Sequence, residues 1–296
     1  MSSVIQVNGL CKNYGSFTAL SGVDLDVQAG EVYGFIGPNG AGKTTTIRVL
    51  LGILKATGGE ARIFGKDAWK EAVEIHKNIA YVPGDVNLWS NLSGGEVIDL
   101  FVRLRKGKNE SRKNELVERF DLDPTKKCRT YSKGNRQKVA LIAAFSSDAD
   151  LYILDEPTSG LDPLMEKVFQ ECVAEVKKAG KAVFLSSHIL QEVERLCDKV
   201  SIIRAGQIIE TGTMAELRHL TRTSVAVETA QAVTGLEKVV GVHDISQTET
   251  ELKFAVEPKE INGALAHLTG LGVTKISVTP PTLEELFMSH YEGNNV

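Results

Sequence analysis

Residues 37–44 read GPNGAGKT; they follow the apolar segment VYGFI at residues 32–36 and lead into residues 44–54, where apolar side chains recur at helical spacing. The run fits the pattern GxxxxGK[ST] between a strand and a helix, the context that makes this pattern specific. Glycines let backbone N–H groups curl around phosphate oxygens, and the following helix N-terminus adds partial positive charge. The stretch therefore predicts a phosphate-binding loop at the end of a buried strand.

Two residues of this loop have distinct expected contacts. We expect Lys43 to reach the β- and γ-phosphates of a nucleotide and the Thr44 hydroxyl to ligate Mg²⁺. The alternative, a glycine-rich turn that binds nothing, is the weaker interpretation because both the strand and the helix are in place. The candidate nucleotide-binding residues of the loop are Gly37, Pro38, Asn39, Gly40, Ala41, Gly42, Lys43, Thr44 and Thr45.

A second element is the run LYILDE at residues 151–156, a wholly apolar strand that ends in two acids. Alone this pattern is weak, but after a phosphate loop in the same chain it becomes strong. We expect Asp155 to hold Mg²⁺ mostly through water, since Mg²⁺ keeps several of its waters. Glu156 is then placed to polarise an attacking water. The candidate metal ligands are Thr44 and Asp155.

Bulk composition excludes several classes of protein. The length of 296 residues suits one large domain and one small one, and the net charge of -4 argues against a general nucleic-acid binder. The four cysteines are scattered without a CxxC pair, which predicts reduced thiols in a cytoplasmic protein. The start of the sequence has no signal-peptide pattern, and no apolar run approaches the ~20 residues that span a bilayer.

Strand and helix patterns alternate over most of the chain, which predicts a mostly parallel α/β core. Strands are expected at residues 4–7, 23–27, 32–36, 80–83, 151–154, 182–186, 200–204 and 207–210, and helices at 44–54, across most of 85–146, at 168–178 and at 189–197. After about residue 220 the order becomes βαββαβ, typical of a ferredoxin-like unit. Its expected elements are 224–228, 232–239, 242–246, 251–256, 258–270 and 273–278, followed by a helix after Pro281.

Residues 131–138 read YSKGNRQK, and this run resembles the signature of ATP-binding-cassette (ABC) ATPases, usually LSGGQ followed by basic and Gln residues. Ser132 and Gly134 match, whereas Tyr131, Lys133 and Asn135 depart from the usual sequence. The resemblance implies that Ser132, Gly134 and Asn135 close over the γ-phosphate of ATP bound to another subunit. A hydroxyl, glycine N–H groups and a helix N-terminus suit this contact.

Further matches follow in the order of the family. Residues 186–188 look like its H-loop, which implies that His188 contacts the γ-phosphate. Tyr14 stands where the family places an aromatic that stacks on adenine; its alternative is an exposed loop tyrosine. Together with Glu156 and Lys43, His188 completes the candidate catalytic set. The segment that resembles the D-loop, which crosses the dimer interface, is Ser159, Gly160, Leu161 and Asp162.

A second run, LSGGE at residues 92–96, is closer to LSGGQ by letter but lies far from the acids at 155–156 and lacks the basic-Gln continuation. We interpret Ser93 as the N-cap of a helix and Glu96 as its capping-box partner.

One position departs from the family in a way that bears on chemistry. The family usually has Gln after the strand that here ends at Pro83, and that Gln touches Mg²⁺ and the attacking water. This chain has Gly84 and then Asp85. We hypothesise that Asp85 substitutes in part, or that coupling to the membrane domain runs through backbone motion.

The resemblance covers residues 4 to about 218. It implies an α/β P-loop NTPase core of the ABC ATPase type, with a RecA-like parallel sheet, an antiparallel β subdomain and a helical subdomain near residues 85–146. We therefore expect a nucleotide-binding domain at 1–218 and a ferredoxin-like accessory or regulatory domain at 219–296. The tail PPTLEELF at 280–287 resembles the C-terminal extension of ATPase subunits in bacterial drug, antibiotic or sodium exporters.

The function implied is hydrolysis of ATP, with Mg²⁺, to power an exporter from the cytoplasmic face of the membrane. Expected partners are a second copy or a homologous ATPase subunit and integral membrane permease subunits, and no nucleic acid. The segment 85–105, with Trp89 and Phe101, is either the dock for the permease or core packing. Other interpretations are a soluble ABC-type ATPase acting on ribosomes or DNA, a P-loop kinase or GTPase, and a regulatory module with a degenerate cassette.

Overall fold

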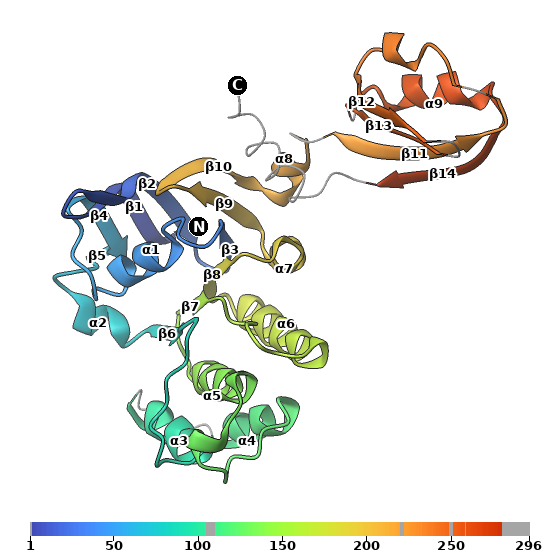
Figure 1. Ribbon diagram of the computed structural model, residues 1–296. Helices are drawn as coiled ribbons and strands as arrows, with labels where there is room; N and C mark the ends of the chain where they lie inside the picture. The colour runs from blue at the N-terminus through green and yellow to red at the C-terminus, as the bar shows by residue number, and fades with distance from the viewer. Residues whose placement is uncertain are drawn as a thin grey trace. The chain divides into compact units, whose positions relative to one another are not determined.

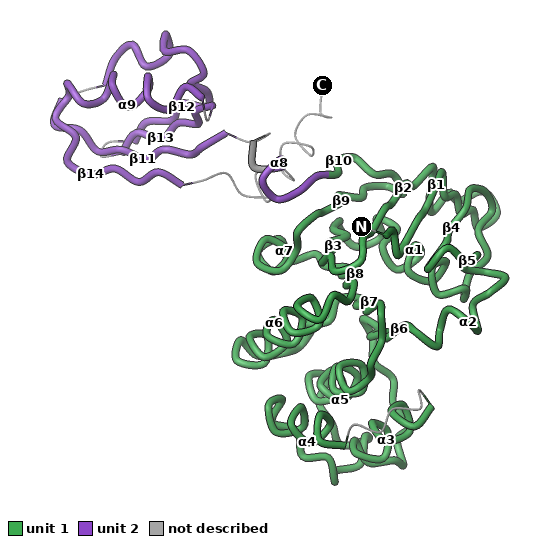
Figure 2. The backbone as a smooth tube through the Cα atoms, turned by 180° about the vertical axis from the view of Figure 1, so that it is seen from behind, with its two compact units in different colours: residues 1–211 green, residues 212–296 purple. Residues whose placement is uncertain are grey.

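The computed structural model of the protein describes residues 2–104, 110–219, 222–231, 233–248, 251–257 and 259–279. The chain divides into two compact units, residues 1–211 and 212–296 (Figure 2). Each unit has a hydrophobic core of its own. The division falls before residue 218, the boundary expected from the sequence, so the short helix α8 (Met214–His219) belongs to the second unit.

A six-stranded sheet of order β10-β9-β3-β8-β7-β6 forms the centre of the first unit (Figure 1). Strands β9, β3, β8, β7 and β6 run parallel, and β3, β7 and β8 are buried at every residue, which accounts for their continuous apolar sequences. The carboxyl ends of parallel strands meet at one edge of a sheet, so the segments after β3, β7 and β8 converge there. The strands are β3 (Val32–Ile36), β6 (Ile79–Val82), β7 (Leu151–Asp155), β8 (Ala182–Ser187), β9 (Lys199–Arg204) and β10 (Gln207–Thr213).

A second, antiparallel sheet of order β2-β1-β4-β5 contains β1 (Ser3–Tyr14), β2 (Phe17–Gln28), β4 (Gly58–Ile63) and β5 (Lys66–Asp67). Helix α1 (Lys43–Leu50) contacts β2 and β4 of this sheet and β7 of the first, so it joins the two. It ends earlier than the predicted residue 54, because Gly52 adopts a left-handed conformation (φ 63°) that stops the helix. Strands β4 and β5 and the short helix α2 (Ala72–His76) were not predicted.

The region predicted as mostly helical contains α3 (Gly94–Leu104), α4 (Glu110–Arg119), the 3₁₀ turn η1 (Cys128–Thr130) and α5 (Lys133–Phe145). Helix α5 contacts α3, α4 and β6 and so ties this group to the sheet. Helix α6 (Pro163–Lys178) begins before the predicted residue 168, because Asp162 caps it and Pro163 suits its first turn. Helix α7 (Leu190–Leu196) contacts β3, β8 and α6.

The second unit contains a four-stranded antiparallel sheet of order β12-β13-β11-β14, the order of a ferredoxin-like sheet. Its elements are β11 (Thr223–Thr229), the 3₁₀ turn η2 (Leu236–Lys238), β12 (Val242–Gln247), β13 (Leu252–Val256), α9 (Ile261–Thr269) and β14 (Val273–Thr279). The helix predicted at 232–239 is wrong within the described residues: only η2 forms, since β-branched residues and a left-handed Gly235 (φ 80°) precede it. The helix predicted after Pro281 lies outside the described residues.

No helix in the described ranges is long and apolar enough to cross a membrane. Among the cysteines, Cys11 is partly exposed and Cys128, Cys172 and Cys197 are buried, all with free thiols.

Candidate active site

The loop after β3 is shaped by glycines at two positions where no other residue fits. A Cβ at Gly37 would lie 2.3 Å from the carbonyl oxygen of Ile203, and Gly42 holds a φ of 115° at the N-cap of α1. The loop also lies close to β9 and β2, since a Cβ at Gly42 would lie 2.7 Å from Leu20 Cδ2. The loop therefore presents backbone N–H groups, rather than side chains, at the start of α1.

Lys43 is the buried cation of this loop, with 5% of its side chain exposed. Its Nζ donates to the carbonyl oxygens of Gly37 (2.6 Å) and Pro38 (3.2 Å) and lies 3.6 Å from Glu156 Oε1. Burial lowers the pKa of Lys43, and the charge of Glu156 opposes this shift. The ammonium is thus held by neutral oxygens and one carboxylate at the edge where β3 and β7 end.

Asp155, at the end of β7, is 3% exposed and lies beside the loop. Its Oδ2 accepts a hydrogen bond from Thr44 Oγ1 at 3.1 Å, and its Oδ1 accepts one from Ser186 Oγ of β8. Asp155 and Ser186 are register partners in the sheet, which explains their contact. Strand, loop and helix together gather hydroxyl and carboxylate oxygens, the donor type that suits a hard cation.

Glu156 adopts a left-handed conformation (φ 47°), which costs a non-glycine residue about 1–2 kcal/mol. Its N–H donates to the Ser186 carbonyl oxygen (3.0 Å), and its carbonyl oxygen accepts from Ser159 N–H (3.1 Å). The turn directs the carboxylate back over the loop, where Oε1 lies 3.3 Å from His188 Nδ1. Strain at a carboxylate that meets both Lys43 and His188 is typical of a functional position.

An open hollow lies in front of the loop. Tyr14 and Phe17, which pair across the β1–β2 hairpin, are both exposed and line it, and Lys12 Nζ lies 5.0 Å above the Tyr14 ring. Two ring faces beside a phosphate loop can stack on a planar base. The hollow is lined by Tyr14, Phe17, Ala19, Pro38, Asn39, Gly40, Gly42, Lys43, Thr44, Thr45 and Glu156.

The segment that resembles the signature packs against the D-loop segment of the same chain. Ser132 caps α5 by accepting from Asn135 N–H (3.2 Å). Lys133 Nζ donates to Ser159 Oγ (2.6 Å), and a Cβ at Gly134 would lie 2.4 Å from the Gly160 carbonyl oxygen. Leu161 follows, and Asp162 accepts from Leu164 N–H and Met165 N–H as the N-cap of α6. Ser132 is exposed at the start of α5 and is not brought to Lys43.

The run at residues 92–96 forms the predicted capping box. Ser93 N–H donates to Glu96 Oε2 (2.6 Å), and Glu96 N–H donates to Ser93 Oγ (3.2 Å). Its glycines are needed for packing, since a Cβ at Gly94 would lie 2.3 Å from Tyr131 Oη and one at Gly95 would lie 3.1 Å from a carbonyl oxygen. The LSGGE run at residues 92–96 is therefore confirmed as the start of α3.

Gly84 lies directly beside the acids. A Cβ added there would lie 3.3 Å from the Asp155 carbonyl oxygen and 3.7 Å from both Asp155 Cγ and Glu156 Cβ. Asp85, in contrast, is exposed, and its carboxylate accepts from Asn87 Nδ2 (3.3 Å). A side chain at position 84 would thus enter the site, whereas that of Asp85 bonds within its own loop.

A glycine-shaped loop after a parallel strand, with a buried lysine and paired acids at the same sheet edge, defines a P-loop nucleoside triphosphatase. The family described as ABC transporter matches residues 20–159, and that described as ATP-binding protein DrrA1-3-like, C-terminal domain, matches residues 212–291. The daunorubicin resistance ATP-binding protein DrrA3 of Streptomyces coeruleorubidus is 33% identical over 99% of this chain and 97% of its own length.

The bacitracin transport ATP-binding protein BcrA of Bacillus licheniformis is 32% identical over the full length of both chains. A solved structure described as the ATP binding subunit of an ABC transporter aligns with a TM-score of 0.68 and 32% identity, over 73% of this chain and 92% of the other. The chain therefore belongs to the ATP-binding subunits of ABC transporters, which are ATPases coupled to transport.

Sequence reasoning missed three residues of this region. Phe17 was not predicted beside Tyr14, although the separation of the two aromatics by a Gly-Ser turn is a hairpin pattern that could have indicated it. The contact of Ser186 with Asp155 depends on the register of two strands far apart in the sequence. Glu192, which is buried and accepts a hydrogen bond from Ser187, carries no sequence pattern that distinguishes it from a solvent-facing helix residue.

Proposed function

We propose that this chain hydrolyses MgATP with Lys43, Thr44, Asp155, Glu156 and His188, and that the energy drives export of a drug, antibiotic or similar small molecule by partner permease subunits. The observation that carries the site assignment is the meeting of Lys43, Glu156 and His188 around one carboxylate oxygen, at 3.6 and 3.3 Å. Export of an antibiotic is supported by the relatives over the whole chain, whose names refer to daunorubicin resistance and bacitracin transport.

The donor set fits a magnesium ion that is shared with a nucleotide. Thr44 Oγ1 and Asp155 Oδ2 lie 3.1 Å apart beside the phosphate loop. No group of three or more His, Cys, Asp or Glu in the described ranges could hold a metal by itself. This agrees with Mg²⁺, which takes one or two protein oxygens and completes its shell with phosphate oxygens and water. When bound, the ion neutralises charge on the β- and γ-phosphates.

Each side chain of the site has a separate role in hydrolysis. Glu156 accepts a proton from the water that attacks the γ-phosphorus, and the bond from that phosphorus to the β,γ-bridging oxygen breaks to give ADP and phosphate. Lys43 stabilises negative charge on the phosphates, and the backbone N–H groups of residues 37–44 hold them in place. His188 orients the γ-phosphate and the carboxylate of Glu156, which it contacts at 3.3 Å. Tyr14 stacks on the adenine.

A second copy, or a homologous subunit, completes the site. Ser132 and Lys133 at the start of α5 are exposed, and within one chain this segment packs on Gly160 rather than on Lys43. Ser132, Gly134 and Asn135 therefore act on ATP held by the partner, with the D-loop segment 159–162 at the interface. ATP closes this dimer, and hydrolysis lets it open.

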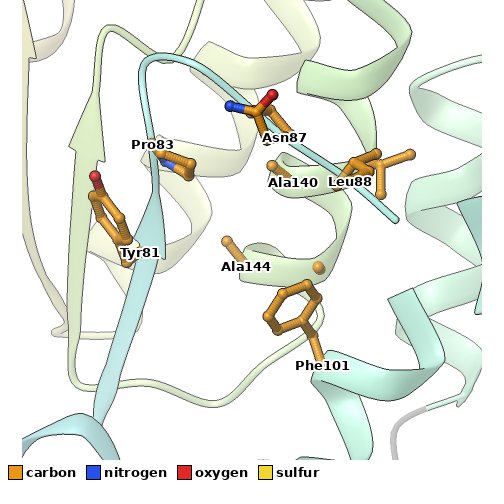
Figure 3. Close-up of a pocket in the computed structure, with 10 residues that line it drawn as sticks. Tyr81, Pro83, Asn87, Leu88, Phe101, Ala140 and Ala144 are labelled. Atoms are coloured by element: carbon orange, nitrogen blue, oxygen red, sulfur yellow. The ribbon is translucent and has the colours of Figure 1, made fainter. Parts of the chain in front are cut away.

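The permease docks on an apolar pocket between the segment after β6, α3 and α5 (Figure 3). Phe101 projects into it from α3, and Tyr81 and Pro83 lie across the pocket from Phe101 (Figure 3). Trp89 is exposed and its ring centroid lies 6.1 Å from that of Phe101, which supports docking over simple core packing for this pair. Through this contact the subunit sits peripherally on the cytoplasmic face of the membrane. The second unit, residues 212–296, acts as an accessory or regulatory domain.

The site assignment is tested by changing Lys43 to Ala and measuring nucleotide affinity by calorimetry. We expect affinity to fall at least about 10-fold, since a charge-assisted contact with phosphate contributes about 1.5–3 kcal/mol. Lys55, which is outside the loop, serves as a matched control when it is changed to Ala. Full affinity in the Lys43→Ala protein contradicts the phosphate role of the loop. Export is tested separately, by co-purification with an integral membrane protein and drug resistance of cells that express both.

A further inference from the structure

Glu192 is a buried acid that the proposed chemistry does not use. It lies in α7, four residues after His188, and only 8% of its surface is exposed. Its Oε2 accepts a hydrogen bond from Ser187 Oγ at 2.7 Å. Its Oε1 is buried and makes no hydrogen bond within the part of the chain that the structure describes. An incompletely paired carboxyl in a protein interior is destabilising, whereas an apolar residue of similar size would not be.

The hydroxyl that binds Glu192 also fixes the backbone on the far side of His188. Ser187 Oγ donates to Glu192 and accepts from Ile189 N–H at 3.0 Å, so the residues before and after His188 are held by one hydroxyl. Helix α7 itself is seated closely on β3, because a Cβ at Gly34 would lie 2.8 Å from Val193 Cγ1. Glu192 thus connects the His188 loop to a rigid part of the sheet layer.

The segment that follows the catalytic acids is held by contacts of its own. Thr158 is 6% exposed and lies two residues after Glu156. The carbonyl oxygen of the intervening Pro157 accepts from Gln137 Nε2 of α5 at 3.0 Å. This segment also meets the strand that leads to His188, because Glu156 N–H donates to the Ser186 carbonyl oxygen at 3.0 Å.

We propose that Glu192 is a positioning residue, which holds His188 at its working distance from Glu156 by anchoring Ser187 and, through the Ser187 hydroxyl, the backbone of Ile189. This inference rests on the role proposed above for His188. Its physical basis is that His188 is exposed and is placed by its loop rather than by packing of its own ring. A shift of about 1 Å in such a group can lower a rate by about 100-fold.

The test uses the purified full-length chain and measures kcat, KM and ATP affinity for Glu192→Leu, Glu192→Gln, His188→Ala and the double variant Glu192→Leu/His188→Ala. We expect Glu192→Leu to lower kcat by about 10- to 100-fold with little change in ATP affinity. Glu192→Gln, which keeps an oxygen acceptor for Ser187, is expected to restore most of the rate. In the His188→Ala background, Glu192→Leu should have no further effect, because the group through which it acts is gone.

Two further variants make the result decisive. Gln191→Leu changes an exposed residue of the same helix and should leave kcat unchanged. Ser187→Ala removes the same hydrogen bond from the side of its donor, so it must lower kcat as well. This variant replaces Glu192→Leu as the test if the Glu192→Leu protein does not fold. Wild-type kcat in both Glu192→Leu and Ser187→Ala overturns the inference while leaving a rate loss in His188→Ala intact. Wild-type kcat in His188→Ala instead contradicts the proposed role of His188, and the role of Glu192 falls with it.

Discussion

At the scale of single residues, Glu156 shows how backbone and chemistry are linked. Its left-handed conformation brings one carboxylate oxygen to both Lys43 and His188. We predict that Glu156→Gln retains ATP binding but loses turnover by at least about 100-fold, because an amide cannot accept the proton of the attacking water. Phosphate release under single-turnover conditions measures this loss, and filter binding measures the retained affinity.

The matched control for this prediction is Glu118→Gln, which makes the same neutral substitution at an exposed position of α4. It should leave both binding and turnover unchanged. Hydrolysis by the Glu156→Gln protein at the rate of the unaltered chain would show that another group accepts the proton.

Position 84 provides a second prediction at this scale. A side chain there points at Asp155 and Glu156, and its Cβ meets neighbours at 3.3–3.7 Å, which the site can accommodate with a small adjustment. Gly84→Gln is therefore expected to lower the Mg²⁺ concentration for half-maximal ATPase rate, since it adds an amide oxygen beside the metal donors. The titration should be repeated with Gly84→Ala, which adds the Cβ without the amide. Identical metal dependence in all three proteins would mean that the position has no part in metal binding.

These residues also show how much of the candidate site could be predicted from the sequence. The pattern at 37–44 and the acids at 155–156 predicted the convergence of Lys43, Thr44 and Asp155, because parallel strands end at one sheet edge. The strained turn at Glu156 was not predictable, since it depends on hydrogen bonds to Ser186 in a neighbouring strand. The sequence also could not show what the side chain of Asp85 contacts. In the structure its carboxylate accepts a hydrogen bond from Asn87.

At the scale of elements, two serines cap two helices, but only one of the two caps is expected to affect ATPase activity. Ser93 and Glu96 close a capping box at α3, whereas Ser132 caps α5 at the segment proposed to reach a partner's ATP. We predict that Ser93→Ala lowers stability by about 0.5–2 kcal/mol with nearly unchanged ATPase activity. Ser132→Ala should cost similar stability and lower the ATPase rate as well. Urea unfolding and steady-state ATPase assays separate the two effects.

A loss of ATPase activity in the Ser93→Ala protein alone would reverse this assignment of the two LSGG-like runs.

The sequence could distinguish the two runs because context counts more than letter match: only the run at 131–138 precedes the acids at the right spacing. Context failed for the helix predicted at 232–239, where the structure has only a 3₁₀ turn. Weak helical periodicity there did not outweigh two β-branched residues and a glycine.

At the scale of the whole molecule, the hydrophobic cores of the two units are separate. The core of the first unit draws its buried residues from positions 4–203, and that of the second unit from positions 225–268. Every side chain of the proposed nucleotide site, from Tyr14 to His188, belongs to the first unit. A unit that has its own hydrophobic core and its own site meets the usual criteria for an independently folding domain.

We therefore predict that a fragment of residues 1–219 folds cooperatively and retains basal ATPase activity within about 2-fold of the full chain, because its core loses no buried member. Calorimetry of the full chain should then show two transitions, one of which the fragment reproduces. Any effect of the second unit on transport would appear only when the permease is present. The matched control is a full-length protein with Val225→Asp, which disrupts the second core and should remove the same transition. An unfolded or inactive fragment would instead mean that the second unit is required for the fold of the first.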